Sequence, residues 1–521
     1  MSQQQVELPD GTPDVTSEVE RKLTVPDSFG DAEIVAALQH VGPVVRQRAQ
    51  KLAAVYYDTE DHRLARARIT LRRRTGGDSG WHLKLPPDNL DPDVREEIQL
   101  PLSAGGPGRV PAALATLVIG VTGSAPLEVQ ATQQTRRIPW WVMADDGSVG
   151  VEVVDDEVNV VGGPQTGLHY RELEVEVKSS PALLAVAVDA LVASGAAPSS
   201  AQSKGVRAMV GDAALPPLVE IGARPRPKQP AADAVRHHVR SQVDMIITQD
   251  LRVRRGRPDA VHQYRVAARR LRSVLQAFEP LVDEVWARSL RAELGWIASV
   301  LSQARDREVL EDRLTDAIRV LPSDVDGAAA LVAVRRHLDA ELVEAQAGID
   351  EAMASDRYVT LIDALHDAVE DTPLTTLAEP KASAVLPPLA DRAWRRLEKQ
   401  ARRLHDELEG HDDHWHLTRI TAKRARYTVE ACVPAFGGRA KKLARQLEQV
   451  TEMLGQHQDA AIAAELARQL ALTTRGARAP FALGVLYAQQ RAEVVALRHE
   501  FVEAWPRISA PEWRGWMVGK S

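Results

Sequence analysis

Hydrophobic and polar residues alternate along the first part of the chain and recur at helical spacing along the second. Between residues 15 and 212, runs such as Leu52–Asp58, Trp81–Leu85 and Tyr170–Lys178 are short and rich in β-forming residues, which predicts strands. From Ala231 onward Ala, Leu, Arg and Glu dominate and apolar residues recur every three or four positions. The pattern predicts a multidomain α+β chain in which a strand-rich domain precedes an all-α domain.

Several of the predicted strands carry charge along one face. Glu18, Glu20 and Lys22 alternate with less polar neighbours, so they share one face of a strand. Glu172, Glu174 and Glu176 do the same on a later strand. On a strand between these two in the sequence, Arg68, Arg72 and Arg74 share one face with Thr70. Solvent-exposed faces of ordinary antiparallel strands would explain any one of these strands. A closed barrel with a polar lumen explains acid and base at period two in several strands of one domain.

The residue types in such a lumen indicate its chemistry. Clustered carboxylates without Cys or His suit a hard divalent cation such as Mg²⁺ or Mn²⁺. Arg and Lys around them suit a polyanion, because Arg makes bidentate contacts to phosphate oxygens. A metal facing a phosphate clamp is the arrangement needed for phosphoryl transfer to water. The sequence has no G-x-S-x-G nucleophile motif and no Gly-rich phosphate loop.

Five short motifs of this part occur in an order that is similar to the CYTH family, the triphosphate tunnel metalloenzymes. They are Glu18-x-Glu20-x-Lys22, Tyr57-Asp58-Thr59, Leu71-Arg72-x-Arg74, Glu172-x-Glu174-x-Glu176 and Ser203-Lys204. For residues 15–212 the resemblance implies an antiparallel eight-stranded β tunnel with flanking helices. It also implies hydrolysis of a triphosphate without a covalent enzyme intermediate. Other members cleave thiamine triphosphate or cyclise ATP, and the tunnel motifs do not separate these outcomes.

The resemblance also implies roles for individual residues. The implied metal ligands are Glu18, Glu20, Glu172, Glu174 and Glu176. The implied catalytic residues are Lys22, Asp155 and Asp156. The implied triphosphate-binding residues are Lys22, Arg72, Arg74, Lys84, Arg95, Arg136, Arg137, Lys204 and Arg207. Which of Arg136 and Arg137, and which of Asp155 and Asp156, faces inward is left open at this point.

The helical part contains an internal repeat. Val261–Arg272 matches Trp415–Arg426 with identical spacing of the basic residues, and Leu301–Asp306 matches Leu454–Asp459 further on. Two homologous bundles are therefore expected, at residues 231–371 and 389–512, joined by the proline-containing segment 372–388. A proline-rich linker is expected at 213–230 and a flexible N-terminus at 1–14.

Each copy of the repeat places basic residues on one stripe of a helix, because positions i, i+3, i+7 and i+10 lie close together. The aligned residues are His262, Arg265, Arg269, Arg270 and Arg272 in the first copy and His416, Arg419, Lys423, Arg424 and Arg426 in the second. Neither stripe has an acid at i+4 spacing, which favours anion binding over a solvated face. The two histidines could instead be core residues bonded to Asp306 and Asp459.

Residues 231–512 resemble the CHAD domain, a helical family often found behind CYTH. The resemblance implies two pseudo-symmetric four-helix bundles and a basic face, made by the two aligned sets above, that binds inorganic polyphosphate. Residues 216–521 carry 45 Lys or Arg and 43 Asp or Glu, so a basic face must arise by charge segregation. Arg395, Arg396, Lys399, Arg402, Arg403, Lys441, Lys442 and Arg445 would extend it. Nucleic acid is a weaker candidate, because no recognised nucleic-acid-binding module is present.

The expected function is metal-dependent hydrolysis of a triphosphate in the tunnel, with inorganic tripolyphosphate ahead of nucleoside or thiamine triphosphates. The helical domain is expected to bind inorganic polyphosphate. The alternative is a protein that binds polyphosphate or a nucleotide without turning it over. A polar N-terminus, the lack of any apolar run of membrane length and a single cysteine, Cys432, predict a cytoplasmic protein with no membrane partner. Such a protein could associate with polyphosphate granules.

Overall fold

The computed structural model describes residues 14–26, 28–87, 94–199, 203–405 and 408–517. The chain forms two compact units, Met1–Leu218 and Val219–Ser521. The division falls inside the expected linker 213–230. Of the N-terminus expected to be flexible, residues 1–13 lie outside the described residues, and Asp14 is the first residue of a strand.

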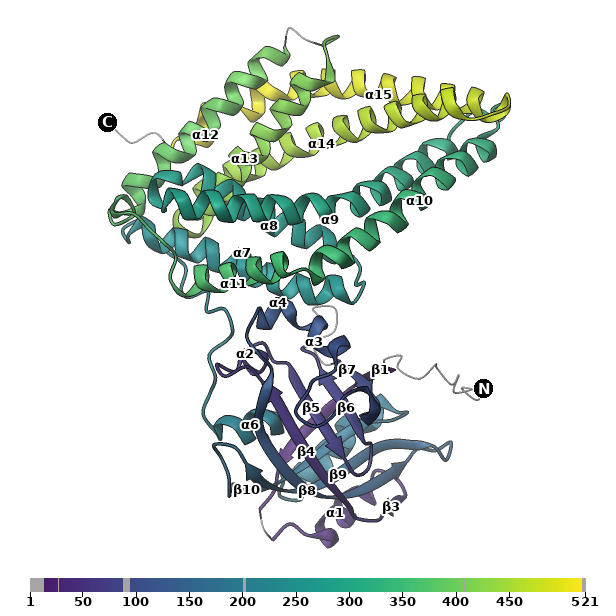
Figure 1. The fold of residues 1–521 in the computed structure, drawn as a ribbon, viewed down its shortest axis with the longest axis vertical. Helices are drawn as coiled ribbons and strands as arrows, with labels where there is room; N and C mark the ends of the chain where they lie inside the picture. The colour runs from purple at the N-terminus through teal and green to yellow at the C-terminus, as the bar shows by residue number, and fades with distance from the viewer. Residues whose placement is uncertain (1–13, 27, 88–93, 200–202, 406–407, 518–521) are drawn as a thin grey trace. The chain divides into compact units, whose positions relative to one another are not determined.

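The described part of the N-terminal unit contains eleven strands, which form one sheet whose paired neighbours are all antiparallel (Figure 1). The strands are β1 (Asp14–Glu18), β2 (Glu20–Thr24), β3 (Val44–Arg46), β4 (Gln50–Asp58), β5 (Thr70–Thr75), β6 (Gly80–Lys84), β7 (Arg95–Leu100), β8 (Glu128–Met143), β9 (Val149–Gly162), β10 (His169–Val177) and β11 (Ala197–Pro198). Their order is β1-β7-β6-β5-β4-β8-β9-β10-β2-β11, and β3 pairs with β8.

The first two strands connect the opposite ends of this curled sheet. Only Val19 separates β1 from β2, yet β1 pairs with β7 and β2 pairs with β10. Taken together as one strand, they complete a wall of eight strands, with β3 and β11 as short additions. The predicted eight-stranded antiparallel tunnel is confirmed in its architecture, and the higher strand count comes from this division and the two short strands.

Alternation along the strands separates an apolar outer layer from a polar interior. Leu23, Val153, Leu173 and Val175 point outward and are almost fully buried under the helices α1 (Asp31–Leu38) and α5 (Pro181–Ala193). Burying side chains of this size contributes roughly 1.5–3 kcal/mol each. Because side chains alternate, the intervening residues of the same strands must point into the tunnel.

Four further helices lie beside the strands of this unit, and one of them reaches the tunnel. They are α2 (Arg63–Arg66), α3 (Ala112–Leu117), α4 (Ile119–Thr122) and α6 (Lys204–Val210). The Ser203 hydroxyl caps α6 by accepting a hydrogen bond from the Val206 amide. A Cβ atom at Gly205 would lie 2.6 Å from the Tyr56 ring, so only glycine allows α6 to approach β4 this closely.

The described residues of the C-terminal unit form nine α-helices. They are α7 (Ala231–Arg254), α8 (Ala260–Ala277), α9 (Glu284–Arg319), α10 (Gly327–Ala354), α11 (Asp356–Glu370), α12 (Ala382–Leu404), α13 (Asp412–Phe436), α14 (Gly438–Thr473) and α15 (Arg478–Ile508). One boundary differs from the expectation that segment 372–388 is a connection. Pro387 and Pro388 lie inside α12, whose buried Leu386, Leu389 and Trp394 hold the helix in the core despite the lost amide donors.

The repeat takes four helices in each copy. α7 to α10 correspond to α12 to α15, and α11 is an addition to the first copy that packs against α7. The far ends of α9, α10, α14 and α15 share one core, which contains Leu314, Leu338, Leu466 and Leu483. The predicted pair of pseudo-symmetric helical bundles is therefore confirmed. Among the described helices, none combines the length and apolarity that crossing a bilayer requires.

Candidate functional site

The tunnel of the N-terminal unit encloses a cavity of 430 Å³. Its wall carries acidic and basic side chains from nearly every strand. The charged lining residues are Glu18, Glu20, Lys22, Arg72, Arg74, Asp78, Lys84, Arg95, Arg137, Glu152, Glu174, Glu176, Lys178 and Lys204. The carboxylates come mainly from β1, β2, β9 and β10, and the guanidinium groups come from β5, β7 and β8. The tunnel thus has an acidic side and a basic side.

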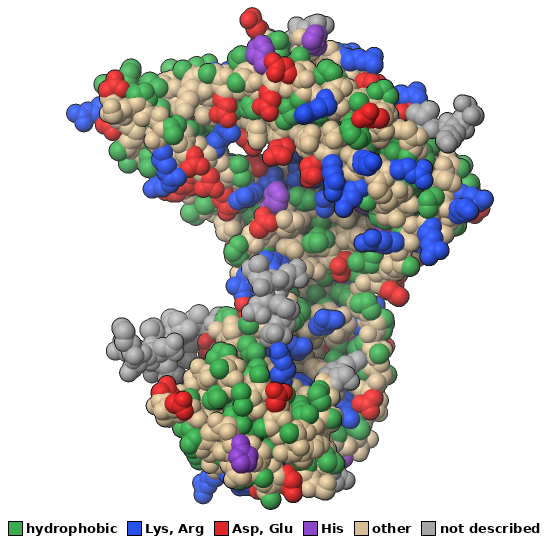
Figure 2. Space-filling view, turned by 180° about the vertical axis from the view of Figure 1, so that it is seen from behind, with side chains coloured by type: hydrophobic (Ala, Val, Ile, Leu, Met, Phe, Trp, Pro, Cys, Tyr) green, Lys and Arg blue, Asp and Glu red, His purple; other side chains and the backbone are tan. Residues whose placement is uncertain are grey.

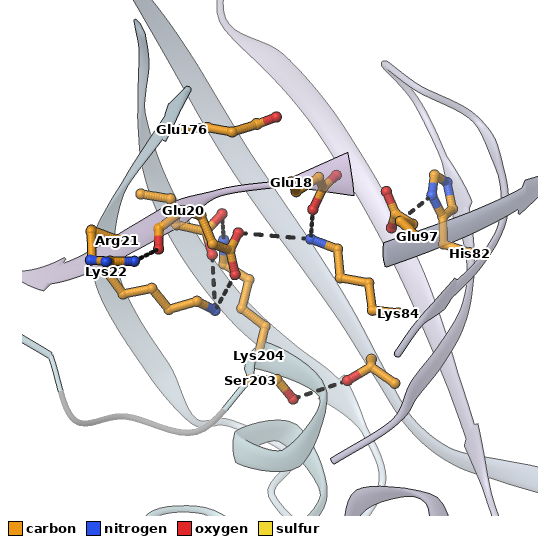
Figure 3. A network of polar contacts seen from close by, with 12 residues as sticks. Glu18, Glu20, Arg21, Lys22, His82, Lys84, Glu97, Glu176, Ser203 and Lys204 are labelled. Carbon is orange, nitrogen blue, oxygen red and sulfur yellow. Dashed lines mark hydrogen bonds and ion pairs between the residues drawn. The ribbon is translucent and has the colours of Figure 1, made fainter. Parts of the chain in front are cut away.

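Two lysines bridge the carboxylates of the acidic side (Figure 3). Lys84 Nζ lies 2.5 Å from Glu18 Oε2 and 3.7 Å from Glu20 Oε2. Lys22 Nζ lies 3.0 Å from Glu174 Oε1 and 4.0 Å from Glu20 Oε1. The pairing of β2 with β10 places Lys22 opposite Glu174, which explains this contact. Glu18 and Glu174 therefore point into one cavity although 155 residues separate them in the sequence.

A buried network closes the tunnel where α6 meets the sheet. Lys204 contacts Glu174 at 2.9 Å, Glu172 at 3.1 Å and also Asp156. Arg137 binds Asp156 through two hydrogen bonds of 2.8 and 2.6 Å. Asp156 is fully buried, so this bidentate pair and Lys204 compensate its desolvation.

The acidic side titrates in two different ways. Burial raises the pKa of Glu18 to about 7; Lys84 opposes the rise, and Glu97 adds to it. Burial would also raise the pKa of Glu174, but Lys204, Lys22 and Arg137 outweigh it and hold the pKa well below its usual range. Glu174 is thus a fixed anion, and Glu18 is a carboxyl that gains or loses a proton near neutrality.

The basic side contains guanidinium groups with few acidic partners. Arg72 lies 3.3 Å from Glu97, whose other oxygen accepts a hydrogen bond from Gln99. Arg74 contacts the exposed carboxylate of Asp78. Burial and then the neighbouring Arg72 lower the pKa of Arg74 to about 9. Positive charge held close together in this way is stabilised by an anion placed between the groups.

The helical unit has a larger cleft of 1050 Å³, lined by α8, α9, α13 and α14. Both predicted stripes reach this one cleft. The stripe residues that line it are His262, Arg265, Arg269, Arg270, His416, Arg419, Lys423 and Arg426. In Figure 2, Lys and Arg side chains cluster on parts of the visible face of the helical unit instead of spreading evenly. The lining of the cleft contains nine Lys or Arg and five Asp or Glu, so the cleft is basic although the charge of the unit is almost balanced.

Charges inside the cleft are incompletely paired. Arg265 is 3.0 Å from Asp306, but the buried Nε atoms of Arg269 and Arg419 have no hydrogen-bond partner among the described residues. Burial, followed by repulsion from Arg269 and Arg419, lowers the pKa of Lys423 to about 6. An anion in the cleft would satisfy these groups.

Comparisons with known proteins match both units. A family model of the CYTH domain matches residues 16–204, and one of the CHAD domain matches residues 237–468. The uncharacterized protein Rv2226 of Mycobacterium tuberculosis is 34% identical over 524 residues, which cover 94% of this chain and 95% of the relative. The chain belongs to the family of CYTH–CHAD proteins.

Two solved structures are each similar to about half of this chain. PptA from Streptomyces chartreusis is 30% identical, with a TM-score of 0.47, and covers 53% of this chain and 99% of its own. The CHAD domain from the plant Ricinus communis is 23% identical, with a TM-score of 0.42, and covers 54% of this chain and 95% of its own.

The CYTH domain brings together most of the predicted tunnel residues, but strand alternation turns two of them outward and a third, on α6, does not reach the cavity. Arg137 and Asp156 face inward, so their neighbours Arg136 and Asp155 face outward, where Arg136 lies 3.8 Å from Glu157 and Asp155 binds Arg171. Arg207, on α6, stacks on the ring of Tyr170. Arg136, Asp155 and Arg207 therefore do not line the tunnel. Glu172 and the predicted catalytic residue Asp156 are not part of the lining and lie just behind it, at Lys204.

Several polar residues of the tunnel were missed, among them Asp78 and three that bear on its chemistry. Glu152, Lys178 and Tyr56 line the same cavity, and Lys178 Nζ lies 3.3 Å from Glu152 and 2.8 Å from Glu176. Alternation could have revealed Glu152, because it has the same parity as the inward-facing Asp156 on β9. Tyr56 had no such signal, because both faces of its strand are largely apolar.

In the CHAD domain, two of the predicted polyphosphate-binding residues do not line the cleft. The alternative in which the two histidines are core residues is wrong. Arg272 and Arg424 do not line the cleft. Asp306 pairs with Arg265, and His416 Nδ1 lies 2.8 Å from Gln458 Oε1. Both histidines line the cleft instead of bonding to Asp306 and Asp459 as core residues.

The carboxylates of the tunnel fit a divalent metal by donor type. CYTH tunnel enzymes generally use divalent metals, and oxygen donors suit hard cations. Within the described ranges, no three His, Cys, Asp or Glu side chains gather closely enough to hold a metal. Lys84 and Lys22 stand between the donors Glu18, Glu20 and Glu174. These lysines must release the carboxylates before the latter can hold a cation.

Proposed function

We propose that the CYTH domain hydrolyses a triphosphate in the tunnel with the help of Mg²⁺ or Mn²⁺. The observation that carries the proposal is the division of one cavity into an acidic side on β1, β2, β9 and β10 and a basic side on β5, β7 and β8. A metal and a triphosphate require opposite surroundings within a few ångströms of each other. The family's use of triphosphate substrates supports this assignment.

Ligand binding would exchange the partners of the charged groups. Lys22 and Lys84, which now bridge carboxylates, would turn to phosphate oxygens together with Arg72, Arg74 and Arg137. Glu18, Glu20 and Glu174 would then hold the cation, which supplies charge neutralisation and polarisation of the phosphoryl group when bound.

We place inorganic tripolyphosphate first among the substrates. The described lining residues are almost all polar or charged, and Tyr56 is the one aromatic side chain among them. A nucleobase or a thiazole ring would find little stacking surface there, whereas a bare phosphate chain needs none. Thiamine triphosphatase activity, cyclisation of ATP and binding without turnover are the competing functions.

Phosphate release from tripolyphosphate, ATP and thiamine triphosphate, measured with and without Mg²⁺ or Mn²⁺, separates these functions. The Glu18→Gln/Glu20→Gln variant should lose at least about a hundredfold in kcat, because it removes donors that act in the transition state. The control is Glu157→Gln, which removes an exposed carboxylate on the outer face of β9 and should leave kcat unchanged. Absence of phosphate release with every substrate and metal would refute hydrolysis, and cyclic AMP from ATP would indicate a cyclase.

We propose that the CHAD domain binds inorganic polyphosphate in its cleft. The two aligned basic stripes meet there, and buried guanidinium atoms of Arg269 and Arg419 lack partners among the described residues. A linear polyanion supplies many acceptors at regular spacing, which suits a cleft 1050 Å³ in volume.

Titration with long-chain polyphosphate tests this part of the proposal. Arg269→Gln/Arg419→Gln should weaken binding by roughly two to four orders of magnitude, since each lost charge-assisted contact costs about 1.5–3 kcal/mol. Arg319→Gln is the matched control, because Arg319 is exposed and pairs with Asp316 on its own helix. Undiminished binding by the folded double variant would refute the cleft assignment.

A further inference from the structure

The two halves of the CHAD domain can be compared position by position. On α8 and α13 the basic stripes align Arg272 with Arg426 and Gln276 with Glu430. On α9 and α14 the match of Leu301 with Leu454 extends through buried positions, because Leu290, Leu294 and Ile297 correspond to Leu443, Leu447 and Val450. The same register aligns Arg291 with Ala444 and Gly295 with Glu448.

In the second half, the arginine of this alignment is fully neutralised. Arg426 donates to Glu430 at 2.7 Å, to Glu448 at 2.6 Å and to the Thr451 hydroxyl at 3.0 Å. Glu430 also accepts a hydrogen bond of 3.1 Å from Arg270. Two arginines and two glutamates thus form a closed, charge-balanced cluster.

In the first half, both acids of that cluster are missing. Gln276 stands in place of Glu430 and Gly295 in place of Glu448. The Arg272 guanidinium lies directly over Gly295, where a Cβ atom would be 3.3 Å from its Cζ. Arg291 lies one turn away on the same side of α9, where the second half has Ala444.

A third arginine, Arg424 of the second half, is expected beside Arg272 and Arg291. Arg424 corresponds to Arg270, whose glutamate partner is replaced by Gln276 in the pseudo-symmetric position. Arg270 of α8 reaches Glu430 of α13, so the pseudo-symmetric Arg424 of α13 is expected beside Gln276 of α8. Arg272 and Arg424 are both exposed. Partial desolvation and then repulsion from Arg291 lower the pKa of each, in agreement with this placement. None of the three has an acid three or four residues away on its own helix. Within the described part of the chain, none of them forms an ion pair.

We propose that Arg272, Arg291 and Arg424 form a second anion site of the CHAD domain, outside the cleft, that takes a short phosphate chain in place of the two missing glutamates. Three guanidinium groups converging without a carboxylate match the several oxygens of linked phosphates by bidentate hydrogen bonds. Arg396 on α12, exposed and close enough to Arg424 to lower its pKa, would extend the site at its rim. The choice of phosphate over other anions rests on the proposed polyphosphate binding by the same domain.

The second site is separate from the cleft. Arg272 and Arg424 do not line the cleft, whereas Arg269 and Lys423, their neighbours on the same two helices, do. The second site therefore lies on a different face of α8 and α13 from the face that lines the cleft. A short phosphate chain should occupy the two sites independently.

The decisive variant puts the glutamates of the second half into the first. In Gln276→Glu/Gly295→Glu the two new carboxylates should pair with Arg272, as Glu430 and Glu448 pair with Arg426. They would then occupy the second site in place of the anion. Glutamate is a better helix former than glycine, and the three atoms nearest to the new Cβ all belong to the flexible end of Arg272. The variant is therefore expected to fold, which helix content and thermal unfolding would verify.

Calorimetric titration with inorganic tripolyphosphate gives the number of bound anions for the full-length protein, with the tunnel inactivated by Glu18→Gln/Glu20→Gln. The parent should bind at two CHAD sites above the tunnel contribution. Gln276→Glu/Gly295→Glu and Arg272→Gln/Arg291→Gln should each lose one site and keep the other, and Arg269→Gln/Arg419→Gln should lose the opposite one.

The outcomes separate the two proposals. If the glutamate variant binds with the stoichiometry and affinity of the parent, the second site is refuted and the cleft proposal stands. If the cleft variant alone leaves binding unchanged, the cleft proposal fails while the second site is supported. Loss of the same single site in both variants would also refute a separate second site.

Discussion

Lys423 gives the sharpest test of the helical domain, because its charge depends on whether an anion is present. It lies on α13 in the cleft, where burial and then Arg269 and Arg419 lower its pKa to about 6, while Asp459 opposes them. Arg265 also faces it and adds to the repulsion. At pH 7 we therefore expect about nine molecules in ten to carry a neutral amine in the free protein.

Polyphosphate in the cleft should reverse this balance. Phosphate oxygens beside Lys423 favour the charged form and return its pKa towards the ordinary value of 10.5. Binding at pH 7 should then take up about 0.9 proton per site. Because the bound state holds a proton that the free state lacks, affinity should fall as pH rises above about 6, by up to about tenfold per pH unit. Below that pH Lys423 is already charged, and its contribution should be constant.

Calorimetry at pH 7 in two buffers of different ionisation enthalpy measures this proton directly. Long-chain polyphosphate is the ligand of choice, because few of its phosphates are terminal groups that titrate near neutrality. Lys423→Arg is the control, since a guanidinium stays charged at every pH of interest and should bind without proton uptake. Binding without proton uptake by the parent, or uptake that persists unchanged in Lys423→Arg, would refute the reasoning.

Three further predictions concern the tunnel. Burial raises the pKa of Glu18 to about 7, so metal-dependent hydrolysis should decline as pH falls through neutrality and the carboxyl gains a proton; a pH–rate profile that stays flat there would contradict this. Lys204→Met should lower the free energy of unfolding by about 3–5 kcal/mol, because Asp156 is left buried without its ammonium partner; denaturant unfolding measures the loss, and an unshifted midpoint would count against it. Gly205→Ala should cost about 1–3 kcal/mol of stability and reduce activity, because the new methyl group would lie 2.6 Å from the Tyr56 ring and displace α6; equal melting temperature and kcat would show that the helix accommodates it.

Strand alternation predicted much of the tunnel lining correctly. Glu18, Glu20 and Lys22 share one face because side chains on a strand alternate, and the structure places all three on the cavity wall. Alternation also requires that only one of Arg136 and Arg137 can face inward, but it does not say which. The choice depends on the register of β8 against β9, where Arg137 lies opposite Asp156.

The helical domain shows a similar limit. The repeat and its basic stripes were visible in the chain, and both stripes do meet in one cleft. The direction of Arg272 was not visible, because the helical stripe that contains it is broad and its last residue turns towards α9. Pro387 and Pro388 were expected to end a connection, but packing of α12 in the core outweighs the hydrogen bonds they remove.

The sequence by itself determined the two domains, the polar faces of the strands and the aligned basic helices, because periodicity is a local property of the chain. Only the tertiary structure decided which charges meet. Lys22 reaches Glu174 through the pairing of β2 with β10, and Lys204 reaches Asp156 because α6 packs against the sheet. The difference between Arg426, neutralised by Glu448, and Arg272, lying over Gly295, likewise depends on contacts between helices. Contacts between residues distant in sequence depend on the packing of the whole fold, which no local pattern records.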